Sequence, residues 1–427
     1  LYGYVMKPFT AEAEFDYELF ASDVIEAQRY MDDIIDLELE KIDRILEKIK
    51  ADPEDEFIKL YEINMWNLIK RKTIAGRRTG LGITSEGDTI AAMGLTYGTD
   101  SANDFAEKIQ RLLKTAAYQS SVIMAKERGA FPIYSAVRES NNPFILRIKD
   151  ESPNLYEQMR EVGRRNIALL TIAPTGSVSI LTQTTSGCEP AFLVAYKRRR
   201  KINPQEKDVT VDFVDDDGIA WSEYFVFHHN FATWLKVNGY DLDLVKKMEA
   251  ESISEIIRKS PYYLATSNDV NWIKKVEMQG RLQKHVDHSI SVTVNLPNDI
   301  DEETVANVYE TGWKSGCKGI TVYRDGSRNG VLISDAEKKE KTRLEVFHDN
   351  HAPKRPKRLK ADVVRFQNNN EKWIAVIGLL DDRPYELFTG KFENGLSTLP
   401  AYVKECEVIR NKIELDEDGR TSRYDIE

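Results

Sequence analysis

The pattern strand, helix, strand over residues 291–323 constrains the fold more than any other feature of this sequence. Two β-branched runs, SVTVNL (Ser291–Leu296) and GITVY (Gly319–Tyr323), flank the segment DEETVANVYETGWKSG. The three acids in the first turn of that segment suit the positive end of a helix dipole. Two strands joined by a helix form a βαβ unit and lie parallel. The pattern therefore predicts an α/β fold rich in helices.

Three long segments before this unit are predicted to be helices: residues 13–50, 57–75 and 101–128. The first has an apolar stripe with steps of three and four residues, formed by Ile35, Leu39, Ile42, Leu46 and Ile49. Between the second and third, RRTGLGITSEGD (Arg77–Asp88) contains Gly-x-Gly but lacks the third glycine of a dinucleotide fingerprint. A tight turn beside a short strand is the favoured interpretation, with nucleotide binding as the alternative.

The first helix also carries three nearby acids, Asp32, Asp33 and Asp36. Asp32 and Asp36 are four residues apart, which places both carboxylates on one helical face and raises the question of a metal site. No histidine lies near them in the sequence. A solvated or hydrogen-bonded polar face is therefore the favoured interpretation, and we predict no metal site.

A candidate phosphate site follows the apolar run Ile167–Ile172. The sequence continues Pro174, Thr175, Gly176, Ser177, Val178, Ser179 and enters a short predicted helix, so residues 164–187 read as strand, loop and helix. The first turn of a helix has about four free N–H groups. Gly176 permits close backbone approach, and three hydroxyls add donors. The alternative is that these hydroxyls only cap the helix. The loop lacks the lysine of a P-loop.

Other chemistry-bearing residues favour structural interpretations. The basic run AYKRRRKI (Ala195–Ile202) reads as a solvated surface, or alternatively as charge near a phosphate. His285 and His288 have a spacing used by metal ligands, but no cysteine or third histidine accompanies them. Cys188 lies near the loop and is expected to be a small buried residue instead of a reactive thiol. The sequence predicts no catalytic residue from these motifs.

Charge and cysteine content narrow the class of protein. The net charge of -10 gives no general attraction for nucleic acid, and no apolar run approaches the ~20 residues of a membrane helix. We expect no membrane partner. Three widely spaced cysteines do not suggest a disulfide framework. A cytoplasmic location is the expectation.

The last part of the chain changes character. Residues 334–360 are charged and proline-bearing and are predicted to be a linker, including a basic cluster over 354–360. Residues 361–427 follow as a small β-rich appendage. Three short strands (ADVVRF, KWIAVIGLL and YELFTG) predict an antiparallel meander, with a helix near residues 398–412. The expected domains are thus 1–333, the linker 334–360, and 361–427.

Several stretches, in this order, resemble one family. They are RRNIALLTIAPTGSVSI, TSGCEPAFLVAYKRRRKI, SISVTVNLPNDI and GWKSGCKGITVYRDGSR, with support from QRYMDDIIDL, RRTGLGIT and ERGAFP. Together they resemble the catalytic large chain of ribonucleotide reductases, most closely the adenosylcobalamin-dependent class, over residues 1–333. The resemblance implies the C-terminal part of a ten-stranded α/β barrel with helices outside. It also implies conversion of ribonucleotides to deoxyribonucleotides by a thiyl radical.

The resemblance carries over residue by residue. Pro174, Thr175, Gly176, Ser177, Val178 and Ser179 match the family's substrate-phosphate loop, so a ribonucleotide is the implied substrate and adenosylcobalamin the implied cofactor. The family's thiyl cysteine lies in an Asn-x-Cys-x-Glu motif, which this sequence lacks. We therefore expect this chain to be inactive alone, as a fragment or one piece of a split enzyme that needs the N-terminal half. A thioredoxin-like reductant is an implied partner, and the family resemblance is compatible with a homodimer.

Two alternatives remain at this point. The metal-dependent class uses an adjacent tyrosine pair near the C-terminus, and the only such pair after the loop, Tyr262–Tyr263, lies in a helix-like context that does not match. The second alternative is a non-catalytic module that binds nucleotide phosphates. That module would bind a nucleotide without the N-terminal half and would give no reductase activity when joined to it.

Overall fold

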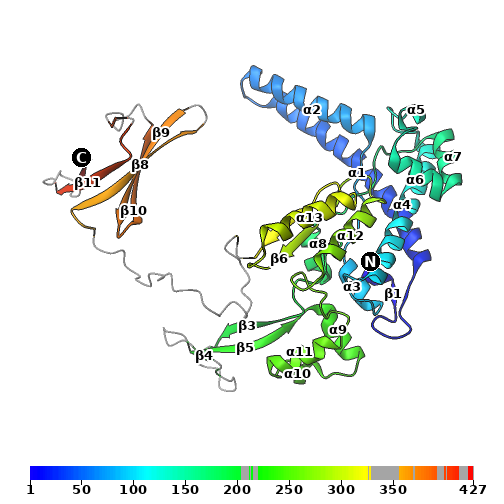
Figure 1. Cartoon of the computed structure of the whole chain (residues 1–427). Helices are drawn as coiled ribbons and strands as arrows, with labels where there is room; N and C mark the ends of the chain where they lie inside the picture. Colours follow the sequence, from blue (N-terminus) through cyan, green and yellow to red (C-terminus); the bar gives the residue numbers. More distant parts are fainter. Residues whose placement is uncertain are drawn as a thin grey trace. The chain divides into compact units, whose positions relative to one another are not determined.

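The chain forms two compact units, Leu1–Glu337 and Lys338–Glu427 (Figure 1). The structure is a computed structural model that describes residues 1–202, 211, 213–214, 220–325, 327, 355–368, 371–391, 399–400, 402–412 and 422–426. Most of the predicted linker, through residue 354, lies outside the described residues. Its last residues belong to the second unit, because strand β8 already begins at Arg358.

The first unit is mainly helical, with short strands. Its helices are η1 (Tyr2–Tyr4), α1 (Tyr17–Ala51), α2 (Glu56–Gly76), α3 (Glu86–Ala92), α4 (Asp100–Arg128), α5 (Ala136–Glu139), α6 (Pro143–Glu151), α7 (Pro153–Val162), α8 (Gly176–Thr182), α9 (His229–Val237), α10 (Leu242–Val245), α11 (Ala250–Arg258), α12 (Trp272–Gln283) and α13 (Glu302–Lys314). Its strands are β1 (Val5–Met6), β2 (Glu14–Phe15), β3 (Ala195–Lys201), β4 (Phe213–Val214), β5 (Ala220–Phe227), β6 (Thr293–Leu296) and β7 (Thr321–Arg324).

The three long predicted helices are confirmed as α1, α2 and α4, and their ends have local causes. The Asp16 side chain accepts a hydrogen bond from the Leu19 N–H and caps α1, and Thr99 does the same for α4. Helix α2 ends at Arg77, whose φ of +43° turns the chain into the next segment. Helices α1 and α2 form an antiparallel hairpin, while α4 packs along α1 (Figure 1).

Four extended segments lie parallel and side by side. Parallel bridges join Leu81 to Leu170 and Ile172 to Ile290, and β6, which follows Ile290, pairs in parallel with β7. The βαβ prediction is therefore confirmed, with α13 as its helix. The regular strand expected at the start of residues 164–187 is only a bridged segment. At Gly82, a Cβ would lie 2.1 Å from the Thr171 carbonyl oxygen, so the closest of these contacts requires glycine.

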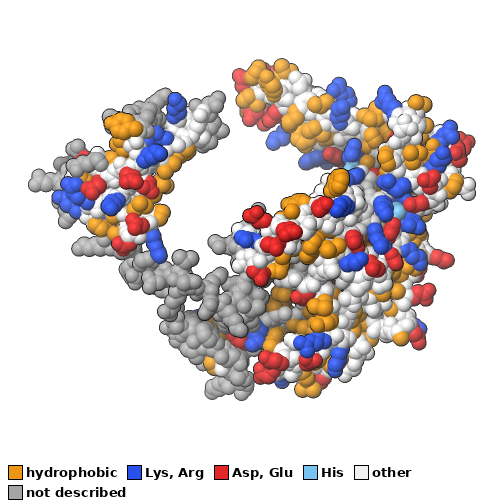
Figure 2. All heavy atoms as spheres, viewed as in Figure 1, with side chains coloured by type: hydrophobic (Ala, Val, Ile, Leu, Met, Phe, Trp, Pro, Cys, Tyr) orange, Lys and Arg blue, Asp and Glu red, His pale blue; other side chains and the backbone are white. Residues whose placement is uncertain are grey.

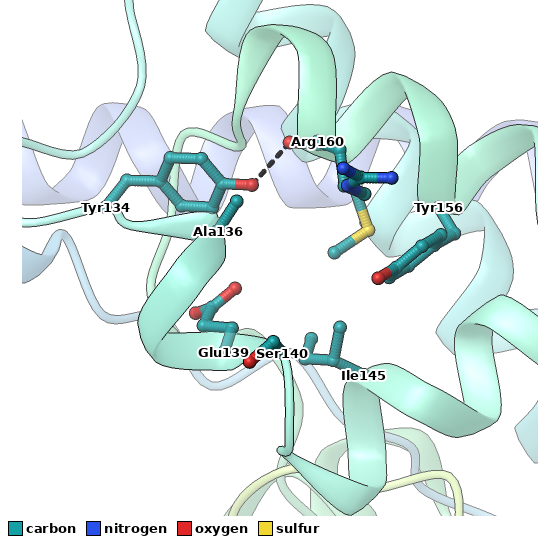
Figure 3. Close-up of a pocket in the computed structure, with 8 residues that line it drawn as sticks. Tyr134, Ala136, Glu139, Ser140, Ile145, Tyr156 and Arg160 are labelled. Atoms are coloured by element: carbon teal, nitrogen blue, oxygen red, sulfur yellow. Dashed lines mark hydrogen bonds between the residues drawn. The ribbon is translucent and has the colours of Figure 1, made fainter.

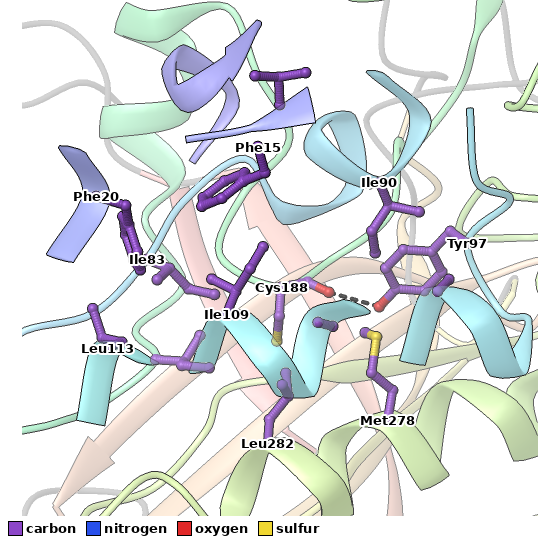
Figure 4. Packing of buried hydrophobic residues seen from close by; sticks show 14 of the residues in the cluster. Phe15, Phe20, Ile83, Ile90, Tyr97, Ile109, Leu113, Cys188, Met278 and Leu282 are labelled. Carbon is purple, nitrogen blue, oxygen red and sulfur yellow. Dashed lines mark hydrogen bonds between the residues drawn. The ribbon is translucent and has the colours of Figure 1, made fainter. Parts of the chain in front are cut away.

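The core of the first unit holds the parallel segments against the helices. Residues of α3, α4, α12 and the bridged segment share one large buried apolar cluster, to which Leu170 belongs. Figure 4 shows Ile90, Ile109 and Leu282 of this cluster. A second, smaller cluster lies between α12, α13 and the β6–β7 pair. Over the described residues, every helix is too short or too polar to cross a membrane.

The second unit is a five-stranded antiparallel sheet. Its strands are β8 (Arg358–Asn368), β9 (Glu371–Leu380), β10 (Arg383–Lys391), β11 (Glu405–Lys412) and β12 (Ser422–Ile426), in the order β10-β9-β8-β11-β12. The three predicted strands are confirmed. The helix predicted near residues 398–412 is wrong, because β11 occupies that region and pairs with β8. Cys406 and Val408 then point to the face that the sheet buries.

Candidate functional site

The predicted phosphate loop, Pro174–Ser179, connects the bridged parallel segment to α8. Thr175 precedes the helix with a φ of +51° and does not cap it. Its hydroxyl instead accepts a hydrogen bond from the Gly187 N–H at 2.7 Å and lies 3.1 Å from the Thr84 hydroxyl. The loop is thereby tied to the segment after α8 and to the segment before α3.

The first turn of α8 keeps its donors available. Because the Thr175 side chain points elsewhere, the N–H groups of Gly176, Ser177 and Val178 have no side-chain cap and no acceptor within the helix. A Cβ at Gly176 would meet no atom within 4 Å, so open space adjoins this turn. Ser177 is exposed, and its hydroxyl has no hydrogen bond within the described part of the chain. These groups are free to donate to an anion.

The other predicted loop residues have internal roles. Ser179 is 5% exposed, and its hydroxyl donates to the Gly176 carbonyl and pairs with the Ser186 hydroxyl, each at 2.8 Å. Pro174 lines a cavity of about 520 Å³ beside the parallel segments. Val178 is 48% exposed and contributes only its N–H. The structure therefore separates the residues that hold the loop in place from those that present donors, and phosphate binding by this loop stays a prediction.

A cavity of about 450 Å³ adjoins the end of α8. Its lining combines hydroxyl and apolar side chains with one carboxylate and one histidine: Thr184, Thr185, Ser186, Glu189, Pro190, Ala191, Phe192, Leu193, His228, Ser267, Thr293 and Asn295. This volume falls within the range of small-molecule sites, roughly 300–1,000 Å³. The segment that follows α8 lines this cavity, and it also holds the loop through the Gly187 N–H and the Ser186 hydroxyl.

A buried carboxylate, Asp88 of α3, organises the wall of this cavity. One of its oxygens accepts hydrogen bonds from His228 (2.7 Å) and Tyr262 (2.8 Å), and the other accepts from Asn230 (2.9 Å) and the Thr185 N–H (2.8 Å). Burial opposes its ionisation, but these hydrogen bonds outweigh burial and hold the pKa of Asp88 below its ordinary value.

Sequence reasoning missed Asp88 and His228. In the sequence, Asp88 was only the last residue of a predicted turn. The four groups that donate to its carboxylate lie 97 to 174 residues further along the chain. No local spacing joins groups that far apart. Only the packing of α3 against the start of α9 and the turn after α11 brings them together.

Glu189, of the stretch Gly187–Pro190, links the cavity to the parallel sheet. Its carboxylate accepts hydrogen bonds from the Thr293 N–H (2.7 Å) and from the buried Lys275 ammonium, and Lys275 also donates to the Thr293 carbonyl. The stretch had no assigned role in the sequence. In the structure, Glu189 connects the segment after the loop to the first residue of β6, Thr293.

Glu86, at the start of α3, is a second buried carboxyl. It has no exposed surface, and neither oxygen has a hydrogen-bond partner among the described residues. Burial raises its pKa from 4.5 to about 8. The folded state therefore prefers the protonated form. The stability that this preference provides is complete below pH 4.5 and is lost as the pH rises toward 8.

We expect Glu86→Gln to remove this pH dependence. In the unmodified protein, ionisation of the unfolded carboxyl alone lowers the free energy of unfolding by about 1.4 kcal/mol per pH unit inside that window. Urea unfolding at several pH values measures the free energy of unfolding of both proteins. The difference between the two values should grow steadily between pH 5 and pH 8. Parallel pH curves would show that Glu86 is ionised when folded.

The cysteine beside the loop is structural, as the sequence predicted. Cys188 is fully buried in the core, among Ile109, Met278 and Leu282, and its carbonyl accepts a hydrogen bond from the Tyr97 hydroxyl at 2.6 Å (Figure 4). Burial raises the pKa of its thiol well above the ordinary value. A thiol in this state is a poor nucleophile.

The two histidines with metal-like spacing are also explained without a metal. His285 is buried beside Glu107, and burial lowers its pKa to about 3, so the ring is neutral. His288 lies near Asp287, whose carboxylate accepts hydrogen bonds from the N–H groups of Leu169 and Leu170. Neither histidine belongs to a group of three potential ligands within the described residues.

The acids of α1 do form such a group, but arginines neutralise it. Asp32 is buried and pairs with Arg77 (2.8 Å), Arg165 (3.1 Å) and Arg128 (3.4 Å), and it also accepts from Asn166 (2.9 Å). Asp33 and Asp36 each pair with one of these arginines. The hydrogen-bonded interpretation of this cluster is therefore confirmed, and its partners are arginines, of which Arg77 is buried.

Two other features are structural. Residues Ala195–Lys201 of the basic run form β3, which pairs with β5. A small pocket between α5, α6 and α7 has a volume of only about 10 Å³, and Tyr134 at its edge donates to the Met159 carbonyl (Figure 3). That volume admits about one water molecule.

Two family models match most of the chain. The family model described as "Ribonucleotide reductase, barrel domain" matches residues 3–323, and the model described as "NrdJ homologue C-terminal domain" matches residues 359–427. The second match agrees with the described start of β8.

Three curated relatives illustrate the range of similarity. A vitamin B12-dependent ribonucleoside-diphosphate reductase of Mycobacterium tuberculosis is 31% identical over 62% of this chain and 34% of its own length. Its namesake in Thermoplasma acidophilum is 26% identical over 78% and 36%, respectively. A ribonucleoside-diphosphate reductase subunit alpha of Chlamydia muridarum is 24% identical over 61% and 26%. The chain thus spans about a quarter to a third of the length of these relatives.

Proposed function

This chain belongs to the ribonucleotide reductase family, whose barrel-domain model matches residues 3–323, and from that membership we propose that it forms part of a vitamin B12-dependent reductase that converts ribonucleotides to deoxyribonucleotides. In this proposal it supplies the substrate-phosphate loop and the C-terminal part of a ten-stranded barrel. The four parallel segments are its contribution to that barrel.

One observation carries the proposal: the Thr175 hydroxyl accepts from Gly187 instead of capping α8. A helix cap was the alternative explanation for the hydroxyls of the loop, and Thr175 does not act as one. The N–H groups of Gly176, Ser177 and Val178 then have no side-chain cap, and a Cβ at Gly176 would meet no atom within 4 Å, so these groups and the Ser177 hydroxyl are free to donate to an anion. Substrate phosphates bound there would hold the ribose in one position and reduce the entropy that the reaction step must overcome.

The radical chemistry is assigned to no residue of this chain. Cys188 is buried with a raised thiol pKa, Cys317 follows α13, and Cys406 lies in the second unit. The thiyl cysteine would come from an N-terminal half of the catalytic unit, and a thioredoxin-like protein would supply electrons. The unpaired cysteines are compatible with the cytoplasm as the site of this reaction.

The cofactor in this proposal is adenosylcobalamin, which when bound starts the radical by homolysis of its cobalt–carbon bond. The cavity of about 450 Å³ has the volume and the hydroxyl lining of a small-molecule site. We assign no described residue to the cofactor and derive no step through it.

The tyrosine pair Tyr262–Tyr263 does not support the alternative, the metal-dependent class of reductase. Tyr262 is buried and donates to Asp88, whereas Tyr263 is 41% exposed. The two rings therefore occupy different environments, and they do not form the paired relay that class requires.

The test of the proposed phosphate site is Ser177→Ala. It removes one donor to a charged group without disturbing the hydrogen bonds of Thr175. Since such a bond contributes roughly 1.5–3 kcal/mol, we expect affinity for a ribonucleoside diphosphate to fall roughly 10- to 150-fold. NMR titration of the chain with the diphosphate measures this affinity from the shifts of the Gly176 and Ser177 amide signals. In an active assembly, the same loss of affinity should appear as a higher KM for the ribonucleotide.

Thr182→Val is the matched control, because this hydroxyl lies at the opposite end of α8 and donates to the Val178 carbonyl. It should leave affinity unchanged. Equal affinity in the Ser177 variant and the control would refute the loop assignment. Diphosphate binding by the chain, with no reductase activity after addition of an N-terminal half, would instead favour the non-catalytic module.

A further inference from the structure

One side of the His228 ring is fixed by buried neighbours. Its Nε2 lies 2.7 Å from the buried Asp88 carboxylate. Tyr262 donates to the same carboxylate oxygen and packs edge to face on the imidazole, with ring centroids 5.9 Å apart. The backbone is held as well, because the His228 N–H donates to the Val194 carbonyl at 2.9 Å. The ring is therefore oriented before any ligand binds.

Asp88 also determines which ring nitrogen carries the hydrogen. Burial opposes ionisation of Asp88, but its hydrogen bonds from His228, Asn230 and Tyr262 hold its pKa below the ordinary value. An ionised carboxylate only accepts hydrogen bonds, so the Nε2 of His228 must be the donor. In the neutral ring the other nitrogen, Nδ1, is then an acceptor.

The accessible edge of the ring is the one that carries Nδ1. His228 lines the cavity of about 450 Å³, and its side chain is 16% exposed, whereas the Asp88 side chain behind it has no exposed surface. Within the described part of the chain, Nδ1 has no hydrogen-bond partner and is not enclosed. His228 therefore offers an uncommitted acceptor.

Three further polar groups of the cavity lining are uncommitted. The hydroxyls of Ser267 and Thr293 and the side-chain amide of Asn295 form no hydrogen bond with any described residue, and they are not enclosed. They lie between α11 and α12 and on β6, whereas His228 directly precedes α9. The folded chain thus gathers several free donors and acceptors around one cavity.

An apolar segment, Pro190–Leu193, forms another part of the lining. Phe192 in this segment is 50% exposed. An exposed aromatic ring offers a face on which a flat heterocycle stacks. A ligand that suits this lining has a flat apolar face together with hydroxyl or N–H groups.

The charges at the cavity favour a neutral ligand group. In the described lining, Glu189 is the only carboxylate, and no lysine or arginine accompanies it. Lys275 balances the charge of Glu189, which leaves the negative charge of Asp88 behind His228. Acidic and basic side chains are interspersed over the visible face of the first unit (Figure 2), so no general positive field offsets this charge. A phosphate group is therefore disfavoured here.

We propose that His228, in the tautomer fixed by Asp88, is a ligand-binding residue whose Nδ1 accepts a hydrogen bond from a hydroxyl or N–H group of a nucleoside bound in this cavity. The choice of a nucleoside rests on the proposed function, because a ribonucleotide carries a flat heterocycle and sugar hydroxyls besides its phosphates. The geometry of the Asp88–His228 pair does not depend on that choice.

The first experiment observes the histidine ring nitrogens by NMR in the chain with isotopically labelled histidine. We expect His228 to carry its hydrogen on Nε2 in the free chain. Its Nδ1 signal should shift on addition of adenosine, guanosine, cytidine or uridine at about pH 8, where histidine side chains are mostly neutral. A hydrogen on Nδ1 in the free chain would overturn the proposal, as would an Nδ1 signal that none of these ribonucleosides shifts.

His228→Gln tests the contact itself. Glutamine keeps an N–H group that reaches Asp88 but removes the acceptor at the position of Nδ1. Affinity for the ribonucleoside should therefore fall about five- to tenfold, as expected for one neutral hydrogen bond, with little change in urea unfolding. His229→Gln is the matched control, since His229 is the exposed neighbour on α9 and is not part of the described cavity lining. Equal affinities in the two variants would overturn the proposal.

Asp88→Asn separates the tautomer from the packing. Asparagine has nearly the same shape, but its amide donates to Nε2 and moves the ring hydrogen to Nδ1. We expect the ring signals to show this change and ribonucleoside affinity to fall about tenfold in the folded variant. A purely structural role predicts an unchanged tautomer, which would overturn the role of Asp88. His228→Gln decides the question if Asp88→Asn does not fold.

Ser177→Ala distinguishes this inference from the proposed phosphate site. That variant should leave ribonucleoside binding unchanged, because a nucleoside has no phosphate. If ribonucleosides shift His228 but Ser177→Ala does not weaken diphosphate binding, the loop assignment alone fails. If Ser177→Ala weakens diphosphate binding but no ribonucleoside shifts His228, the present inference alone fails.

Discussion

Replacing Asp32 by alanine is expected to lower the free energy of unfolding of the first unit by about 3–5 kcal/mol. The Asp32 side chain has no exposed surface and pairs with arginines from α4, from the end of α2 and from the segment after α7. Removal of the carboxylate leaves Arg77 and Arg165, both mostly buried, with fewer partners. Urea unfolding followed by circular dichroism measures the loss.

Asp33→Ala is the matched control for that experiment. Asp33 is the next residue of α1, its side chain is 50% exposed, and it pairs only with Arg128 among the described residues. An exposed ion pair contributes about 0–1 kcal/mol. Similar losses in the two variants would contradict the view that burial gives Asp32 its importance.

The pH dependence of the same cluster has a definite sign. Burial opposes ionisation of Asp32, but the hydrogen bonds and charge of its arginines prevail and lower the pKa of its carboxyl. A lowered carboxyl pKa stabilises the folded state above the unfolded value of 3.8. That contribution is lost as the pH falls through the folded value. Asp32→Ala should therefore lower the free energy of unfolding by less at pH 3 than at pH 7.

The second large effect is expected from Asp88→Ala. Four donors, three of them on buried residues, would lose their acceptor: Tyr262, Asn230, His228 and the Thr185 N–H. Each unsatisfied buried donor costs about 1–3 kcal/mol, so a total loss of roughly 3–5 kcal/mol follows after partial relaxation. Urea unfolding measures this loss.

The Asp88 variant should also weaken the proposed phosphate site. The Thr185 N–H anchors the segment between α8 and Gly187, and Gly187 in turn donates to Thr175. NMR titration with a ribonucleoside diphosphate should therefore show lower affinity at a temperature where the variant remains folded. Asp100→Ala is the control, since Asp100 is an exposed acid at the start of α4 that pairs with Lys274. Unchanged affinity in the folded Asp88 variant would mean that the network supports only stability.

The sequence predicted features that depend on neighbouring residues. Helices α1, α4 and α13 follow from apolar periodicity and capping residues, because both act within a few turns of the chain. The parallel β6–β7 pair follows from the length of its connecting helix. The phosphate loop was predicted because glycine, hydroxyls and a helix start lie next to one another, and its binding of phosphate stays a prediction.

Features set by distant partners were missed or read wrongly. The residues of β11 were assigned to a helix, and pairing with β8, more than 40 residues earlier, makes them a strand. The run Ile167–Ile172 forms only bridges, because its partners come from positions 81 and 290. The basic residues at the end of the predicted linker enter β8, where Arg358 pairs with Glu407.

The division between sequence and tertiary structure is clearest at the loop itself. The residue types of Pro174–Ser179 determine that donors are available there, because hydroxyls and first-turn N–H groups belong to the local chain. The tertiary structure decided that the Thr175 hydroxyl does not cap the helix, because this hydroxyl accepts a hydrogen bond from the Gly187 N–H. The roles of Asp88 and Asp32 were likewise decided by packing. A buried carboxylate is stable only where distant donors and cations converge on it, and no local pattern encodes that convergence.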